Sequence, residues 1–253
     1  NDAEFQVIKE ADLSTLITPY LSIGLVILLM FLLIYFSKMP KNGDQSHSIN
    51  FIPTIKRIFS IHNYREGIIA QFFYVGAQIM CWTFIIQYGT RLFMEQGMDE
   101  KSAEILSQEY NIVAMVIFCI SRFICTFILR YLNAGKLLMI LAIAGGFLCV
   151  GTIVFHDIWG LYCLVAISAC MSLMFPTIYG IALKGLGDDA KFGAAGLIMA
   201  ILGGSVLPPL QAKIIDMKEV FDMPAVNLSF ILPFICFVVV SIYGYRSYKR
   251  VLE

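Results

Sequence analysis

The sequence predicts an all-α membrane protein with seven transmembrane helices. Hydrophobic residues make up 59% of its 253 residues and charged residues only 14%, and the mean hydropathy is +0.79. A soluble domain is about 45 to 50% apolar, so this composition excludes an ordinary water-soluble fold. Seven stretches have the roughly 20 apolar residues that a spanning helix needs. They lie at residues 16–37, 66–91, 108–131, 135–155, 158–183, 192–215 and 225–246.

The first span, 16–37, follows a polar and acidic stretch, NDAEFQVIKEAD. This stretch is not the basic and then apolar start of a signal peptide. Asp12 or Ser14 can cap the helix, and Pro19 lies near its start, where a missing amide hydrogen is least harmful. Because the chain begins with Asn1 rather than Met, we expect it to be the middle of a longer protein.

One substantial linker separates the first span from the other six. Its sequence, KMPKNGDQSHSINFIPTIKRIFSIHNYRE, contains Pro, Gly, Asn and Ser, and its second half can form a short amphipathic segment. We therefore divide the chain into four parts. They are an extracytoplasmic segment at 1–15, a single transmembrane helix at 16–37, a cytoplasmic linker at 38–65 and a six-helix bundle at 66–253.

The distribution of Lys and Arg predicts the orientation, because these residues accumulate in short cytoplasmic loops. Alternate assignment of the loops puts twelve basic residues on one side and five on the other. The larger set comprises Lys38, Lys41, Lys56, Arg57, Arg65, Arg130, Lys136, Lys184, Lys191, Arg246, Lys249 and Arg250. The smaller set comprises Lys9, Arg91, Lys101, Lys213 and Lys218. We therefore expect a multi-pass protein of the inner (cytoplasmic) membrane with a cytoplasmic carboxyl terminus.

Composition and motifs argue against several classes of function. The formal net charge is 0, so no overall field favours a nucleic acid. All seven cysteines lie in apolar stretches with no CxxC pair, which is typical of small buried side chains rather than disulfides or metal ligands. The loop KGLGDDAKFG lacks the spacing of a phosphate-binding loop, and no HExxH or GxSxG motif is present. The sequence therefore predicts no enzyme, no metal site and no cofactor.

Polar residues recur along one face of the second span, within AQFFYVGAQIMCWTF. Gln71, Tyr74, Gln78 and Trp82 follow one another at spacings of three, four and four, which forms a strip roughly 16 Å long. A hydrogen bond between helices would explain one such residue, but four in register favour a hydrated wall. Amides, a phenol and an indole suit a ring with hydroxyls on its edges and C–H groups on its faces.

The third span also has polar groups on one face. Asn111 and Arg122 are three helical turns apart, with Met115 and Phe118 between them on the same face. An Arg inside a span needs a carboxylate, backbone carbonyls or cavity water as a partner, unless its side chain extends to the cytoplasmic end of the helix. Both explanations of Arg122 are compatible with the sequence.

The fifth span combines polar residues with a predicted bend. Ser168, Ser172, Phe175 and Tyr179 lie along one face, and Pro176 removes the backbone hydrogen bond to the carbonyl of Ser172. Transporters use such interruptions at binding sites. The sixth span contains AAG and GGSVLPP, whose small residues predict close contact between helices.

The stretches AQFFYVGAQIMCWTFIIQY, SRFICTFIL and SLMFPTIYGIALKGLGDDAKFGAAGLIMAILGGSVLPP resemble the carboxyl-terminal half of the fucose:proton symporter family within the major facilitator superfamily. The resemblance runs from about residue 64 to the end, and the first span resembles the sixth helix of that twelve-helix fold. It implies a symporter for fucose, galactose, glucose or a related hexose that works by alternating access between two six-helix halves. The substrate contacts that it implies are Gln71, Tyr74, Gln78, Trp82, Arg122 and Tyr179.

The resemblance also implies partners for the chain: a sugar, a proton, the lipid bilayer and an amino-terminal transporter half. In this family the proton-coupling carboxylates lie in the first half, which agrees with the lack of a deep Asp or Glu in the later spans. Without that half, this chain should not transport. The family has glycine where this sequence has Ser121.

A complete seven-helix receptor or photoreceptor is the alternative from another class, because seven spans with an external amino terminus match that topology. The last span, NLSFILPFICFVVVSIYGYRS, has no Lys at its centre that could form a retinal Schiff base. The uneven spacing of one span and then six also disfavours a receptor.

Overall fold

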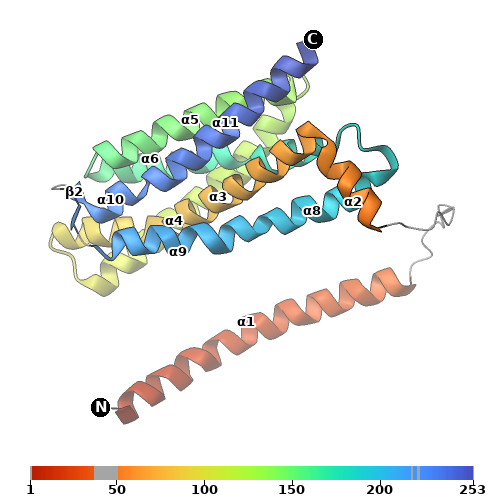
Figure 1. Ribbon diagram of the computed structural model, residues 1–253. Coiled ribbons are helices and arrows are strands. Elements are labelled where there is room, and N and C mark those ends of the chain that lie inside the picture. Colours follow the sequence, from red (N-terminus) through yellow and green to blue (C-terminus); the bar gives the residue numbers. More distant parts are fainter. Residues whose placement is uncertain (1, 37–50, 218, 221–222, 253) are drawn as a thin grey trace. The chain divides into compact units, whose positions relative to one another are not determined.

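The computed structural model describes residues 2–36, 51–217, 219–220 and 223–252, and these are almost entirely helical (Figure 1). The α-helices are α1 (Asp2–Phe36), α2 (Phe51–Ser60), α3 (His62–Glu95), α4 (Glu100–Ile128), α5 (Ala134–Val154), α6 (Ile158–Met171), α7 (Met174–Leu183), α8 (Ala190–Met199), α9 (Gly203–Ile215), α10 (Ala225–Ser229) and α11 (Ile231–Leu252). The remaining elements are the 3-10 helices η1 (Gly187–Asp189) and η2 (Ala200–Leu202) and an antiparallel strand pair, β1 (Glu219–Val220) and β2 (Met223–Pro224).

The chain forms two compact units, Asn1–Ile49 and Asn50–Glu253. The first contains α1, which begins at Asp2 and is therefore longer than the predicted span at 16–37. Its apolar stretch is Pro19–Leu33.

The second half of the predicted linker contains α2, whereas residues 38–50 lie outside the described residues. Ile58 on α2 is buried and packs with Tyr64 of α3. Lys56 and Arg57 on the same short helix are exposed. The helix therefore has an apolar face on the bundle and a basic face away from it, which confirms that this segment is amphipathic.

Six helical stretches of the described chain are long and apolar enough to cross a membrane. They are His62–Glu95, Glu100–Ile128, Ala134–Val154, Ile158–Leu183, Ala190–Ile215 and Ala225–Val251. Each overlaps a predicted span, and several continue into polar residues at their ends, where sequence patterns define boundaries poorly. With the apolar stretch of α1, they confirm the predicted all-α membrane fold.

The fifth span consists of two helices, α6 and α7, with an interruption at Ser172 and Leu173. Pro176 is the third residue of α7 and has no backbone N–H, so it cannot donate to the carbonyl four residues earlier. The predicted bend is therefore confirmed. The sixth span is likewise divided, into α8, η2 and α9.

Glycines bring the sixth span close to α3. A Cβ atom at Gly203 would lie 1.9 Å from the carbonyl oxygen of Phe72, and one at Gly76 would lie 2.2 Å from a terminal carbon of Leu207. The backbone of Phe72 cannot move aside for a side chain, so only glycine is tolerated at position 203. The predicted packing role of GGSVLPP is confirmed at this position.

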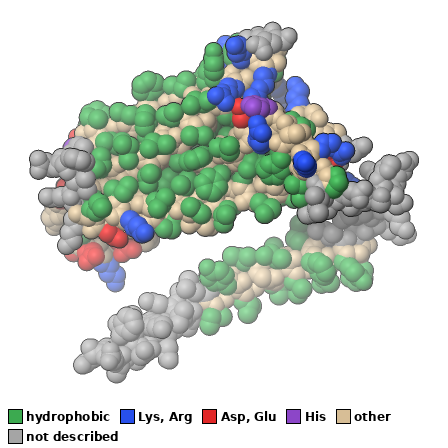
Figure 2. Space-filling model, viewed as in Figure 1, with side chains coloured by type: hydrophobic (Ala, Val, Ile, Leu, Met, Phe, Trp, Pro, Cys, Tyr) green, Lys and Arg blue, Asp and Glu red, His purple; other side chains and the backbone are tan. Residues whose placement is uncertain are grey.

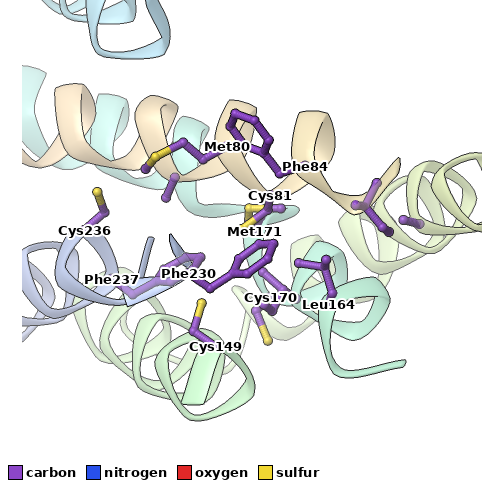
Figure 3. Close-up of a cluster of buried hydrophobic side chains, with 14 of the residues drawn as sticks. Met80, Cys81, Phe84, Cys149, Leu164, Cys170, Met171, Phe230, Cys236 and Phe237 are labelled. Carbon is purple, nitrogen blue, oxygen red and sulfur yellow. The ribbon is translucent and has the colours of Figure 1, made fainter. Parts of the chain in front are cut away.

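The core of the second unit is rich in sulfur (Figure 3). Side chains from α3, α5, α6 and α11 meet there, among them Met80, Cys81, Cys149, Cys170, Met171 and Cys236. All seven cysteines are free thiols, and five are buried. Cys119 is exposed and Cys163 is half-buried, so the prediction of burial is wrong for these two. An apolar span has a face toward lipid as well as a face toward the core, and the sequence pattern does not separate them.

On the face that Figure 2 shows, charged side chains gather at the two ends of the bundle and leave an apolar band between them. Lys and Arg are concentrated where α2 and the carboxyl end of α11 lie, and we call this the basic end. There Glu66 of α3 forms salt bridges with Arg246, at 2.7 Å, and with Arg250. The central helix is α3, which contacts α4, α6, α7, α9 and α11.

Candidate functional site

The strip of predicted site residues on α3 crosses from the core to the surface of the bundle. Gln71 and Tyr74 are fully buried, whereas Gln78 and Trp82 are half-buried. The strip is therefore not a hydrated wall along its whole length in this structure. Its first half is covered because α3 is the central helix and has neighbours on several sides. Only the half with Gln78 and Trp82 reaches the surface.

Tyr74 connects α3 to the interruption between α6 and α7. Its hydroxyl donates a hydrogen bond to the carbonyl oxygen of Met171, at 2.9 Å. Its ring also packs edge-on against Phe175 of α7, with ring centroids 6.3 Å apart. A buried backbone carbonyl at a helix end needs a partner, and the phenol supplies it.

Trp82 makes the second connection between α3 and its neighbours. The indole Nε1 donates to the Ser168 hydroxyl on α6, at 3.2 Å. The indole ring meets the ring of Phe118 on α4 edge-on, with centroids 5.0 Å apart. Both contacts hold the indole in one orientation with part of its surface exposed.

Arg122 also contacts the ring of Phe118. Its guanidinium carbon is 5.6 Å from the centroid of the Phe118 ring, and the side chain is exposed. Such a cation–π contact is worth about 0.5 to 1 kcal/mol at an exposed site. Trp82, Phe118 and Arg122 thus form one group from α3 and α4, which we call the Trp82–Phe118–Arg122 cluster.

Tyr179 belongs to a row of aromatic rings along α7. It stacks on Phe175, with centroids 6.4 Å apart and an interplanar angle of 12°. Because Phe175 also contacts Tyr74, these three rings link α3 with the first two turns of α7 after the interruption. Tyr179 itself is half-buried.

Two predicted site residues have polar atoms without partners. Both amide atoms of Gln71 are buried and make no hydrogen bond, and the same is true of the Asn111 side-chain oxygen. An unpaired buried polar group costs about 1 to 3 kcal/mol, so such groups are uncommon in native proteins. Asn111 shares α4 with Arg122 but lies outside the Trp82–Phe118–Arg122 cluster.

The exposed part of the site offers an indole edge, an amide and a guanidinium. These groups donate hydrogen bonds and cover apolar C–H faces, which suits an uncharged ligand with many hydroxyl groups. Within the described chain, no group of three or more His, Cys, Asp or Glu side chains could hold a metal ion.

Comparison with known proteins identifies the fold. No family model matches the chain. It is 50% identical over 251 residues to the L-fucose-proton symporter of Haemophilus influenzae. The match covers 98% of this chain and 56% of that relative. A crystal structure of the Escherichia coli fucose:proton symporter superposes with a TM-score of 0.77 at 30% identity, over 91% of this chain and 54% of that one. The chain belongs to the fucose:proton symporter family of the major facilitator superfamily.

The chain spans about half the length of the curated relatives it matches, and it corresponds to the carboxyl-terminal half of the symporter fold. The putative glucose/galactose transporter of Helicobacter pylori is also similar, with 27% identity over 244 residues, 96% of this chain and 57% of that relative. These relatives are transporters, so the alternative of a seven-helix receptor receives no support.

Three contact partners of the site were not predicted as site residues, although the sequence indicates their helix faces. Ser168 and Phe175 share the predicted face of the fifth span with Tyr179, and Phe118 lies between Asn111 and Arg122. Helical spacing thus placed them correctly. Their contacts with α3 depend on how the helices are rotated against each other, which spacing does not reveal.

A second polar junction, at the end of α5, was not predicted from the sequence. The Asn227 side-chain amide on α10 donates to the carbonyls of Thr152, at 3.0 Å, and Phe155, at 3.2 Å. The Tyr88 hydroxyl on α3 also donates to the Phe155 carbonyl, at 2.8 Å. These bonds close the end of α5 against α3 and α10. The feature of the sequence that could have indicated this junction is the Asn near the start of the last predicted span.

A bidentate salt bridge joins α2 to η1 at the basic end of the bundle. The Arg57 guanidinium donates to both carboxylate oxygens of Asp189, at 2.6 Å each. The hydrogen bond with Arg57 lowers the pKa of Asp189 below its ordinary value. Asp189 is at the N-cap position of α8, but its side chain makes no capping hydrogen bond and instead pairs with Arg57.

Proposed function

We propose that this chain is the carboxyl-terminal half of a proton-coupled sugar symporter that works by alternating access. The observation that supports it best is the set of hydrogen bonds from α3 to the interrupted fifth span, Tyr74 to Met171 and Trp82 to Ser168. Interrupted helices at the midplane are typical of substrate sites in transporters. The names of the relatives support fucose, galactose, glucose or a related hexose as the substrate, with a transporter rather than an enzyme as the function.

In this proposal the residues at the surface contact the sugar and the buried residues position them. Trp82 covers an apolar face of the ring, and Gln78 and Arg122 donate to its hydroxyls. Tyr74 and Tyr179 hold the aromatic row and the interruption in place. Gln71 and Asn111 bring unpaired amides close to the pathway, where water or sugar hydroxyls satisfy them when the transporter changes conformation.

Proton coupling needs a group that gains and loses a proton during the cycle. The seven predicted site residues include no carboxylate and no histidine. We therefore propose that the titrating carboxylates belong to an amino-terminal half, which the relatives contain in addition to the region matched here. That half also completes the sugar pathway. The partners are thus the sugar, the proton, the lipid bilayer and the amino-terminal half, and no cofactor or nucleic acid.

The excess of Lys and Arg at the basic end supports an orientation with that end in the cytoplasm. We propose an inner-membrane location, a cytoplasmic carboxyl terminus and a cytoplasmic linker at 38–65. Residues 1–15 then lie outside the cytoplasm, 16–37 cross the membrane, and 66–253 form the six-helix bundle. Labelling of single cysteines introduced at Arg65 and Lys101 with a membrane-impermeant maleimide, after the native thiols are replaced, tests this orientation. Only the cysteine at Lys101 should react from outside.

Uptake of labelled sugars by the complete transporter tests the function. We expect Gln78→Ala to reduce uptake of the accepted sugar about tenfold, since one lost hydrogen bond to a bound hydroxyl is worth about 1.4 kcal/mol. Gln108→Ala is the matched control, because Gln108 is exposed on α4 and outside the site. Membrane expression of both variants is checked by immunoblot. Unchanged uptake by Gln78→Ala would remove Gln78 from the site, and no uptake of L-fucose, D-galactose or D-glucose by the wild type would contradict the proposal.

A further inference from the structure

A second polar stripe runs along α3, on a face that the predicted strip does not include. Thr83 and Gln87 are exposed and Thr90 is half-buried, at spacings of four and three residues. Such spacings put the three side chains on one face of the helix, along roughly 10 Å of its length. At 100° per residue, this face is rotated by roughly 140° from the predicted strip. We call Thr83, Gln87 and Thr90 the open stripe.

The open stripe belongs to a helix that is long and apolar enough to cross the membrane. Polar side chains in such helices normally face the interior of the protein or a water-filled cavity, because contact with lipid is costly. The exposed side chains in the middle of α5, such as Ile143 and Phe147, are apolar and suit lipid. Thr83 and Gln87 are exposed on this bundle and polar. We therefore expect them to face water rather than lipid.

A hollow of about 710 Å³ lies beside the open stripe, at the end of the bundle opposite the basic end (Figure 1). Gln87 and Thr90 line it from α3, and Glu100 and Glu104 line it from α4. The end of α9 and the start of α10 complete the lining. Its volume is within the range of about 300 to 1,000 Å³ that ligand sites occupy. We call it the α3–α4 hollow.

The chemistry of the α3–α4 hollow suits an uncharged ligand with many hydroxyl groups. The Gln87 amide both donates and accepts hydrogen bonds, and the Thr90 hydroxyl, which donates to the Ser107 hydroxyl at 3.4 Å, can still accept one. The carboxylates of α4 accept hydrogen bonds from hydroxyls and repel an anion. Arg91 also lines the hollow, but it already pairs with Glu95, at 2.9 Å.

We propose that the open stripe and the α3–α4 hollow form a second contact surface for the sugar, between the end opposite the basic end and the part of the site at Gln78 and Trp82. This inference rests on the proposed sugar transport. Thr83 follows Trp82 in the chain and is one helical turn from Gln87, so the stripe connects the hollow to the indole. A helix of the amino-terminal half is the other possible occupant. It would bury the amide and hydroxyls of the stripe, which costs about 1 to 3 kcal/mol for each group left unpaired.

Single cysteines test the open stripe in the purified complete transporter, after its native thiols are replaced. Thr83→Cys and Gln87→Cys should react with a water-soluble maleimide, because both positions are exposed. At about four times its dissociation constant, the accepted sugar should slow these reactions about fivefold. Gln96→Cys is the matched control, whose reaction rate should not change, because Gln96 is exposed at the end of the same helix and does not line the hollow. Failure of both stripe cysteines to react, as under a covering helix, or equal rates with and without sugar, would overturn the proposal.

Uptake kinetics separate this inference from the proposed function itself. Gln87→Met removes the amide and keeps a similar length, so we expect the KM for the accepted sugar to rise about fivefold while the maximal rate stays unchanged. Gln96→Met is the control and should change neither value. An unchanged KM in Gln87→Met, with normal uptake by the wild type, would overturn this inference and leave the proposed function intact. No uptake of L-fucose, D-galactose or D-glucose by the wild type would contradict the proposed function and this inference with it.

Discussion

The hydroxyl of Tyr74 on α3 donates a hydrogen bond to the carbonyl of Met171, the last residue of α6. This carbonyl lies at the interruption that precedes Pro176. In the hydrocarbon layer no water is present to pair with a free carbonyl, so a side chain from a neighbouring helix has to do it. Tyr74 thus ties the central helix of the bundle to the break in the fifth span.

Tyr74→Phe should lower the free energy of unfolding by about 1 to 2 kcal/mol, because it leaves the Met171 carbonyl unpaired while the ring keeps its contact with Phe175. Denaturant unfolding in detergent measures this. Tyr131→Phe is the control, since the Tyr131 side chain is 75% exposed. Equal stability of Tyr74→Phe and wild type would show that the hydrogen bond contributes nothing.

Arg122 and Phe118 should be energetically coupled in sugar uptake. We expect Arg122→Gln to reduce uptake about tenfold with little effect on stability, because the side chain is exposed and its main described contact is with one ring. A double-mutant cycle with Phe118→Leu should give a coupling energy of about 0.5 to 1 kcal/mol.

Phe123→Leu is the matched control for this cycle, because Phe123 is also on α4 and its side chain is 79% exposed. The effects of Arg122→Gln and Phe123→Leu on uptake should be additive. If the effects of Arg122→Gln and Phe118→Leu are additive too, the contact between Arg122 and Phe118 does not contribute to uptake.

Gly203→Ala should strongly destabilise the bundle, because its Cβ would lie 1.9 Å from the carbonyl oxygen of Phe72. Overpacking of this kind costs about 1 to 3 kcal/mol or more, and here the obstacle is backbone. Gly180→Ala is the control, because a Cβ there meets open space. It should be neutral or slightly stabilising, since alanine favours helix. A thermal shift assay tests this by comparing the melting temperatures of both variants with that of the wild type.

The Arg57–Asp189 salt bridge predicts a dependence of stability on pH. Its hydrogen bonds lower the pKa of Asp189 in the folded protein. A carboxyl with a lowered folded pKa stabilises the fold above its unfolded pKa, about 3.9, and loses this effect as pH falls through the folded pKa. The difference in melting temperature between wild type and Asp189→Asn should therefore be constant from pH 5 to 8 and shrink below about pH 4.

Asp216→Asn serves as the control for this pH series, because Asp216 is exposed at the end of α9. Hydrogen exchange of α2 gives a second readout, since the salt bridge anchors that helix to η1. Exchange of α2 that is no faster in Asp189→Asn would contradict the anchoring role.

The sequence by itself was sufficient for the membrane class, the positions of the spans and the bend ahead of Pro176. These features depend on local properties, namely the length of an apolar run and the missing N–H of proline. The strip at Gln71, Tyr74, Gln78 and Trp82 follows from helical spacing in the same way. The resemblance to the symporter family came from long motifs and needed no structure.

Only the tertiary structure decided which residues of that strip are buried and which partners they have. Gln71 and Tyr74 lie inside the bundle because neighbouring helices cover this part of the α3 face, whereas Gln78 and Trp82 are only half-buried. The pairings of Tyr74 with Met171 and of Trp82 with Ser168 join residues about 90 positions apart. Such contacts depend on the rotation and separation of whole helices, which are set by packing along their entire length rather than by any local pattern.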